Sequence, residues 1–157
     1  MKSTANIDHP EVIAWPPVIF VANALAGGLV HFAVPIRMMT YSVSLWIGIT
    51  LMLISAALAL WAERAMQAAG TNIRPDRPAL AVVKNGPYRF TRNPMYVALC
   101  LLQIAIGFVV DGLIPLLFVI PLALTLHYGV VRREETYLES KFGEQYLALK
   151  RKVRRWI

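Results

Sequence analysis

Four long apolar segments constrain this chain more than any other feature of its sequence. They run over about 16–36, 43–62, 94–110 and 113–131, and none contains Asp, Glu, Lys or Arg. Each is close to the roughly 20 residues that a helix needs to cross a bilayer, the third and fourth being shorter. Because the bilayer core offers no water to backbone groups, such spans must be helical. The sequence therefore predicts an all-α integral membrane bundle of four transmembrane helices, formed by one domain over 1–157.

The composition supports a membrane protein and argues against nucleic acid as a partner. Apolar residues make up 57% of the chain and the net charge is +7. The basic residues gather beside the apolar segments, where they commonly set membrane topology or contact anionic headgroups. We therefore expect membrane lipids as partners. No spacing of residues typical of a metal site is present, so no metal is predicted.

The distribution of basic residues predicts how the chain crosses the membrane. The link over 63–93 carries six Lys and Arg residues and the tail after Val131 carries eight, whereas the link over 35–42 carries just Arg37. Because positively charged segments stay in the cytoplasm, the long link and the tail are expected there. An even number of spans then places both termini in the cytoplasm, and we expect the membrane to be a bacterial inner membrane.

The tail is predicted to form an amphipathic interfacial helix over about 132–153. Apolar residues recur at steps of three and four, which makes one apolar stripe among basic residues. Such a helix can lie on the membrane surface, or its stripe can pack on the protein's own cytoplasmic loop. We expect Gly143 to loosen or break it. The stripe consists of Leu138, Phe142, Tyr146, Leu149, Val153 and Trp156.

A tight turn at 111–112 joins the third and fourth spans, so two polar clusters far apart in sequence should meet on one membrane face. The first cluster is 86–96 and the second is 132–135. Glu134 and Glu135 directly follow a span, where a carboxylate is costly unless it is paired or hydrated. Either acid could hold a cationic ligand group or form a salt bridge with a nearby arginine. They lie 100° apart around a helix, so at most one is expected to face a shared site.

The first cluster offers groups for the rest of a charged ligand. Pro94 starts a helix directly after Asn93, and a helix N-terminus suits a carboxylate or phosphate. Tyr88, Phe90 and Tyr96 could stack on a nucleobase or a cation, or they could belong to an interfacial aromatic belt.

Three further residues are weaker candidates, for contact with a substrate. Arg132 and Arg133 lie beside the two acids, and His127 precedes them by one to two helical turns. A histidine there could act as a general base, but position alone does not favour it, and we assign no catalytic residue.

Two segments closely resemble the isoprenylcysteine carboxyl methyltransferase-like family, whose wider relatives include the membrane phospholipid methyltransferases. They are VVKNGPYRFTRNPMY at 82–96 and REETYLESKFGEQY at 133–146, and the resemblance covers about 71–156. Members of this family are integral membrane enzymes that use S-adenosylmethionine.

The resemblance implies which residues bind S-adenosylmethionine, with Glu134 holding its ammonium group. The sequence departs from the isoprenylcysteine enzymes at Asn93, where they have His, and at Val130, where they have an arginine that contacts the substrate. Both departures argue against prenylcysteine as the acceptor. The implied lining of the cofactor pocket consists of Leu80, Ala81, Val82, Val83, Tyr88, Asn93, Pro94, Met95 and Tyr96.

These observations predict an S-adenosylmethionine-dependent methyltransferase whose lipophilic acceptor enters from the bilayer. One alternative is an NADPH-dependent membrane reductase of the sterol-reductase type, although the phosphates of that cofactor should demand more basic contacts and fewer acids. Another is a non-catalytic four-helix membrane protein. A transporter would place its acid at mid-span, whereas Glu134 and Glu135 lie at the edge of one.

Overall fold

The computed structural model describes residues 8–157, and over these residues the chain forms helices and no β-strand. The predicted all-α class is therefore confirmed for this part of the chain. The N-terminal end itself, which was expected in the cytoplasm, lies outside the described residues. The helical elements are α1 (Pro16–Ala33), α2 (Tyr41–Ala68), η1 (Gly86–Arg89), α3 (Pro94–Val109), α4 (Leu113–Leu117), α5 (Val119–Leu126), the π-helical η2 (His127–Val131), α6 (Arg132–Phe142) and α7 (Glu144–Lys152).

Three helical stretches of the described chain are long and apolar enough to cross a membrane. They are α1 with 18 residues, α2 with 28, and the run from α4 to α6 with 30. Helix α3 is apolar but has only 16 residues, fewer than the roughly 20 of a typical span. The protein is thus an integral membrane protein, and a fourth complete span at α3 stays a prediction.

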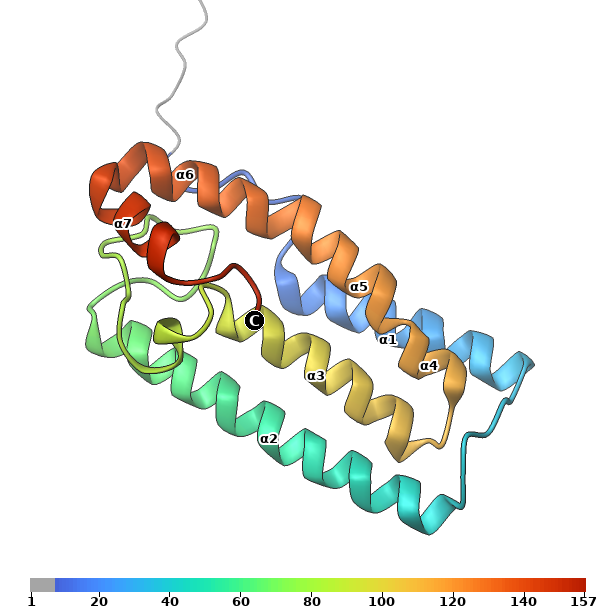
Figure 1. The fold of residues 1–157 in the computed structure, drawn as a ribbon. Coiled ribbons are helices and arrows are strands. Elements are labelled where there is room, and N and C mark those ends of the chain that lie inside the picture. The colour runs from blue at the N-terminus through green and yellow to red at the C-terminus, as the bar shows by residue number, and fades with distance from the viewer. Residues whose placement is uncertain (1–7) are drawn as a thin grey trace, which may run out of the picture.

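Helix α3 lies at the centre of the bundle, between α2 on one side and α1 with α4 and α5 on the other (Figure 1). Buried and partly buried polar side chains join these helices. The side-chain nitrogen of Gln103 on α3 donates to the carbonyl of Pro115 at 2.7 Å. Asn23 on α1 donates to Gln103 and to the carbonyl of Phe118. In an apolar surrounding, such bonds between helices satisfy groups that would otherwise be buried without a partner.

The last long run is segmented rather than one regular helix. It breaks at Phe118, between α4 and α5. Pro121 lies three residues later and has no N–H to bond the carbonyl of Leu117, which accounts for the break. The π-helical segment η2 follows, and α6 continues directly from it with Arg132 as its first residue. The apolar part of the run therefore ends at Val131, and α6 lies beyond it.

The predicted tail helix over 132–153 is divided into α6 and α7 at Gly143, where the sequence predicted a break. Gly143 has a φ of 49° and separates α6 from α7. Residues with a side chain rarely adopt this conformation, so glycine permits the turn there. The break folds α7 back, and the stripe apart from Trp156 packs with Val82 of the protein's own loop, whereas Trp156 packs on the bundle core. A role of this stripe on the membrane surface stays a prediction. The packed cluster contains Tyr146, Leu149, Val153, Leu138, Phe142 and Val82.

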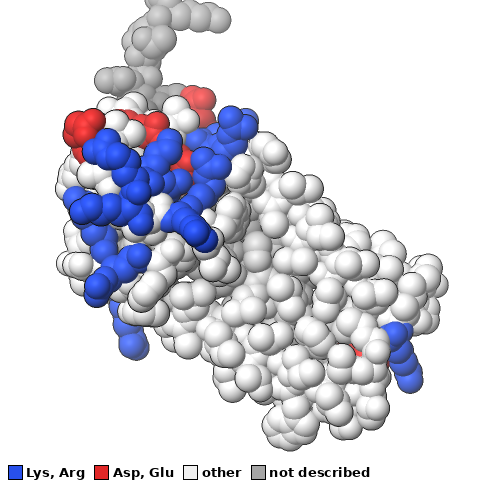
Figure 2. Space-filling view, in the orientation of Figure 1, with Lys and Arg blue, Asp and Glu red and all other residues white. Residues whose placement is uncertain are grey.

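Polar structure gathers at one end of the bundle, and we call this region the cap. The cap consists of the loop over 69–93 with η1, of α6 and α7, and of 153–157 (Figure 1). Arg154 pairs with Thr91 in an isolated bridge, so the C-terminal segment lies beside the start of α3. Figure 2 shows Lys and Arg side chains crowded on the cap, above a bundle surface that is mostly uncharged. This asymmetry agrees with the distribution read from the sequence.

Candidate functional site

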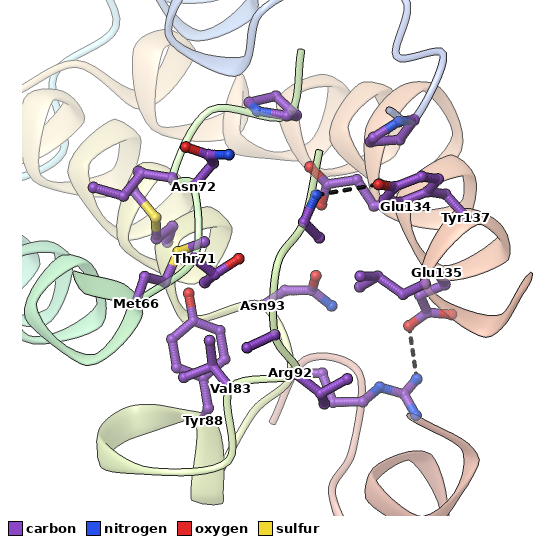
Figure 3. Close-up of a pocket in the computed structure, with 18 of the residues that line it drawn as sticks. Met66, Thr71, Asn72, Val83, Tyr88, Arg92, Asn93, Glu134, Glu135 and Tyr137 are labelled. Atoms are coloured by element: carbon purple, nitrogen blue, oxygen red, sulfur yellow. Dashed lines mark hydrogen bonds and ion pairs between the residues drawn. The ribbon is translucent and has the colours of Figure 1, made fainter. Parts of the chain in front are cut away.

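The cap encloses a cavity of about 130 Å³, which we call the cap cavity. Eight of the predicted cofactor residues line it, whereas Leu80 and Pro94 do not. Leu80 turns outward with 62% of its surface exposed, and Pro94 is buried in the helix start. Figure 3 shows the cavity between side chains of α6 and side chains of the loop and of η1. The eight are Ala81, Val82, Val83, Tyr88, Asn93, Met95, Tyr96 and Glu134.

Glu134 faces this cavity without a cationic partner among the described residues. Its Oε1 accepts a hydrogen bond of 2.7 Å from the hydroxyl of Tyr96 on α3. Burial raises the pKa of Glu134 to about 7; the bond from Tyr96 opposes this shift, and the charge of Glu135 adds to it. A carboxylate that is buried and unpaired is costly, and a bound cation would remove that cost.

Glu135 has a different environment, although it is adjacent and also lines the cavity. Nη2 of Arg92 lies 2.7 Å from one carboxylate oxygen and Nη2 of Arg155 lies 2.7 Å from the other. Burial opposes the charged form of Glu135, but the two arginines outweigh it and hold its pKa below the usual value. The expectation that at most one acid would face the site is therefore wrong. Glu135 forms the salt bridges. The carboxylate of Glu134 has no cationic partner among the described residues and is therefore available to a cationic ligand group.

An aromatic and apolar wall lies across the cavity from the two acids. Tyr88 extends from η1, and its ring lies near Met66 and Thr71 (Figure 3). Burial and the charge of Glu134 raise the pKa of the Tyr88 hydroxyl, so it stays neutral. Phe90 does not take part: it is 69% exposed and packs against Trp61 outside the cavity. One of the aromatic residues of the first cluster is thus excluded from the site.

The start of α3 is more fully occupied by internal bonds than the sequence predicted. The backbone N–H of Asn93 bonds the hydroxyl of Thr91, and the N–H groups of Tyr96 and Val97 bond the carbonyl of Asn93. The side chain of Asn93 donates to the carbonyl of Arg155 at 2.9 Å. Asn93 therefore holds the C-terminal segment against the cap, and few N–H groups remain there for an anion.

The arginines predicted to contact a substrate lie outside the cap cavity. Arg132 and Arg133 line a separate open groove with Tyr128. The guanidinium of Arg132 lies 5.8 Å from the centre of the Tyr128 ring, and Arg133 donates to the carbonyl of Glu11 at 2.7 Å. The structure thus does not bring these two side chains to the site of Glu134.

His127 is also directed elsewhere. Its Nδ1 is 3.3 Å from Nε1 of Trp156, and the two rings stack. The indole N–H can only donate, so Nδ1 of His127 is the acceptor. Val130, which stands at the position of a substrate-contacting arginine in the isoprenylcysteine enzymes, is fully buried in the core.

Sequence reasoning missed the segment that crosses α6 and helps to close the cavity. The hydroxyl of Tyr137 accepts a bond from the N–H of Ala79 at 3.1 Å and donates to Asp8. Lys141 forms an ion pair with the same aspartate. Nearby, the N–H of Ile13 bonds the carbonyl of Gly129. We call residues 8–15 the N-terminal strap, and no motif in the sequence indicated it.

Thr71, Asn72 and Arg77 are further cavity residues that no motif indicated. The hydroxyl of Thr71 accepts a bond of 2.9 Å from the N–H of Leu80, and Asn72 donates to the carbonyl of Pro78. These bonds join residues within the loop to one another. The sequence shows that the link over 63–93 is polar. This composition does not distinguish these three residues from the other polar residues of the link.

The fold and the cavity define an integral membrane protein with a polar site at one end of an apolar helical bundle. The sequence pattern of the phospholipid methyltransferase family matches residues 43–145, which is more than half of the chain. The protein belongs to this family, and membership indicates a membrane methyltransferase. The matched region includes α3, Glu134 and Glu135, so it contains most of the cap cavity.

A shorter relative matches part of the chain. It is an uncharacterised protein of Haemophilus influenzae, 43% identical over 63 residues. The alignment covers 40% of this chain and the whole of that protein. The family resemblance found in the sequence is thus confirmed by the family match, and this relative adds no assignment of substrate.

Proposed function

We propose that the protein is an S-adenosylmethionine-dependent methyltransferase of the bacterial inner membrane that acts on a lipophilic acceptor. The observation that carries this proposal is the carboxylate of Glu134, which faces the cap cavity with Tyr96 as its one hydrogen-bond partner among the described residues. The ammonium group of S-adenosylmethionine, the methyl donor, would supply a positive charge beside Glu134, where no described residue supplies one. Family membership supports the same reaction class.

The cavity residues fit the chemical groups of this donor. Glu134 would hold the ammonium, and the ring of Tyr88 with Val83 offers an apolar surface for the adenine. When bound, S-adenosylmethionine supplies an electrophilic methyl group on a sulfonium, and S-adenosylhomocysteine is released. Glu135 would not compete for the ammonium because Arg92 and Arg155 already neutralise it.

The cavity volume implies that part of the cap moves to admit the donor. Sites for drug-sized ligands typically have volumes of about 300 Å³ or more, whereas the cap cavity has about 130 Å³. The loop over 71–83 and the N-terminal strap form much of its boundary, because Ala79 bonds Tyr137 and Pro10 lines the cavity. Their opening would admit the donor, and their closure would exclude water from the reacting groups.

The chain's contribution to the reaction would be positioning and exclusion of water. We assign no general base: a carboxylate acceptor would need none, whereas an amine or thiol acceptor could require one. The basic cap would lie in the cytoplasm, where the donor is available, and the acceptor would enter from the bilayer. The basic surface of the cap supports this orientation.

Calorimetric titration of S-adenosylmethionine into the detergent-purified protein tests this proposal. We expect saturable binding that weakens at least tenfold in Glu134→Gln, a loss of about 1.4 kcal/mol. Glu139→Gln is the matched control, because Glu139 lies on the same helix, bonds Lys150 and does not line the cavity. NADPH is the control ligand. No binding of S-adenosylmethionine, or unchanged affinity in Glu134→Gln, would overturn the proposal.

A further inference from the structure

A second cavity, of about 280 Å³, lies among α1, α2 and α3. We call it the lateral groove. Most of its wall is apolar, and its polar Ser55 already donates to the carbonyl of Ala98 at 2.8 Å. Because these helices form the apolar bundle, the groove suits an apolar chain rather than a polar ligand. Its wall includes Trp15, Met52, Ala56, Ala59, Leu99 and Leu102.

The lateral groove meets the cap cavity at a shared wall. Ile73, Arg74, Pro75, Met95 and Tyr96 line both spaces. Tyr96 is the residue whose hydroxyl bonds Glu134. An amphiphile whose chain occupied the groove would therefore present its polar end beside the proposed donor site.

Arg74 is the one charged residue among the described residues that line the lateral groove. Its guanidinium lies 5.5 Å from the centre of the Trp15 ring. Nε and Nη2 bond the carboxylate of Asp76 at 2.9 and 2.7 Å, and Nη1 has no hydrogen-bond partner in the described part of the chain. About half of each side chain in this ion pair is exposed. An exposed pair of this kind contributes little stability, so another anion can replace Asp76.

The other arginines of the cap cavity do not reach the lateral groove. Arg92 forms an ion pair with Glu135, and Arg77 lines the cap cavity but not the lateral groove. Arg74 thus combines three properties: contact with both spaces, a free donor nitrogen, and an aromatic ring that supports its planar face. A planar guanidinium recognises carboxylate and phosphate groups well.

We propose that the lateral groove and Arg74 form the acceptor site, with Arg74 determining its specificity. The ligand class is an amphiphile whose apolar chain fills the groove and whose carboxylate or phosphate binds the guanidinium. This assignment rests on the proposed methyltransferase function, because it treats the shared wall as the place where acceptor and donor meet.

Photo-crosslinking in nanodiscs of neutral lipid tests the acceptor site. The probes are a diazirine-labelled long-chain fatty acid, its methyl ester, and a lysophosphatidic acid with the same chain. We expect the anionic probes to label lateral-groove residues at least tenfold more than the ester does.

Arg74→Gln should reduce labelling by both anionic probes to the level of the ester, and Ala59→Trp should reduce labelling by all three. The more strongly labelling anionic probe identifies the headgroup. Arg64→Gln, at an exposed arginine of α2 outside both spaces, should change nothing.

Two results would overturn this assignment: labelling of the unmodified protein outside the groove, or an anionic preference that persists in Arg74→Gln. Calorimetry with S-adenosylmethionine separates acceptor from donor recognition. Because Arg74 also lines the cap cavity, we expect Arg74→Gln to reduce anionic labelling far more than it reduces donor affinity. A loss of that affinity with an unchanged anionic preference would assign Arg74 to the donor instead. A protein that binds no S-adenosylmethionine but shows Arg74-dependent labelling would contradict the proposed function and leave the amphiphile site in place.

Discussion

The hydroxyl of Tyr96 donates a hydrogen bond of 2.7 Å to the carboxylate of Glu134, which lies 38 residues later in the chain. Tyr96 belongs to the first turn of α3, and Glu134 belongs to the first turn of α6. The chain leaves the cap through α3 and returns through α4, α5 and η2, so both helix starts lie at the same end of the bundle. The bond therefore joins the two polar clusters that flank the apolar hairpin.

The environment of Glu134 predicts that the affinity for S-adenosylmethionine depends on pH. Its pKa of about 7 means that the empty site is mostly neutral at pH 5.5 and half ionised at pH 7. Because a cation favours the ionised form, affinity should rise by about 15-fold between these pH values. The comparison stops at pH 7 because the α-amino group of S-adenosylmethionine is expected to titrate near pH 8, and its loss of charge would also change the affinity.

Calorimetric titrations at several pH values measure this dependence, and Glu134→Gln provides the control. The glutamine cannot ionise, so its weaker affinity should be nearly constant over the same range. A dependence of equal size in both proteins would show that another group causes it. Affinity of the unmodified protein that falls as pH rises would contradict the assignment of Glu134 to a cation.

Glu135→Gln should destabilise the protein, whereas Glu144→Gln should not. The side chains of Arg92 and Glu135 are each only 6% exposed, and removing one charge from a buried pair typically costs about 3 kcal/mol or more. Glu144 pairs with Arg151 at a surface where both side chains are mostly exposed, and such pairs contribute about 0–1 kcal/mol. Thermal unfolding in detergent measures both effects. Equal midpoints for the two variants would show that the buried pair does not hold the cap together.

Gly107→Ala should weaken the contact between α3 and α4. A β-carbon at this position would lie 2.6–2.7 Å from backbone and side-chain atoms of Leu116. The helices would have to separate, which typically costs about 1–3 kcal/mol. Gly28→Ala is the control, because a β-carbon there meets nothing within 4 Å. The control should be neutral or stabilising, since alanine favours a helix over glycine by about 1 kcal/mol.

Unfolding temperatures in the same detergent compare these two glycine variants. A lower midpoint for Gly107→Ala alone is the expected result. If both variants unfold at the temperature of the unmodified protein, α3 and α4 pack less closely than the structure indicates.

Much of the fold could be predicted from the sequence because hydropathy is a local property. Every long uncharged run is helical, although the fourth is divided into α4, α5 and η2. The tight turn at 111–112 correctly predicted an apolar hairpin that brings two polar clusters together. The helix limits were less predictable. Helix α2 continues to Ala68, beyond the expected end at 62, because polar residues such as Glu63 and Arg64 can extend a helix once it leaves the apolar part of the bundle.

The site was less predictable, because its chemistry depends on which side chains meet. Eight of the implied cofactor residues line the cap cavity, but Leu80 and Pro94 do not. Arg132, Arg133 and His127 are near Glu134 in sequence and yet contact other partners. The N-terminal strap and Arg74 carry no sequence motif, so their position at the cavities could not be foreseen.

The sequence by itself determined an all-α membrane protein with two polar clusters beside an apolar hairpin, because uncharged runs of this length must be helical in a bilayer. Tertiary structure decided the difference between Glu134 and Glu135. Both are glutamates in the same helical turn, but Arg92 and Arg155, from distant parts of the chain, reach just one of them. A charge's behaviour depends on the groups within a few ångströms, and folding brings those groups together.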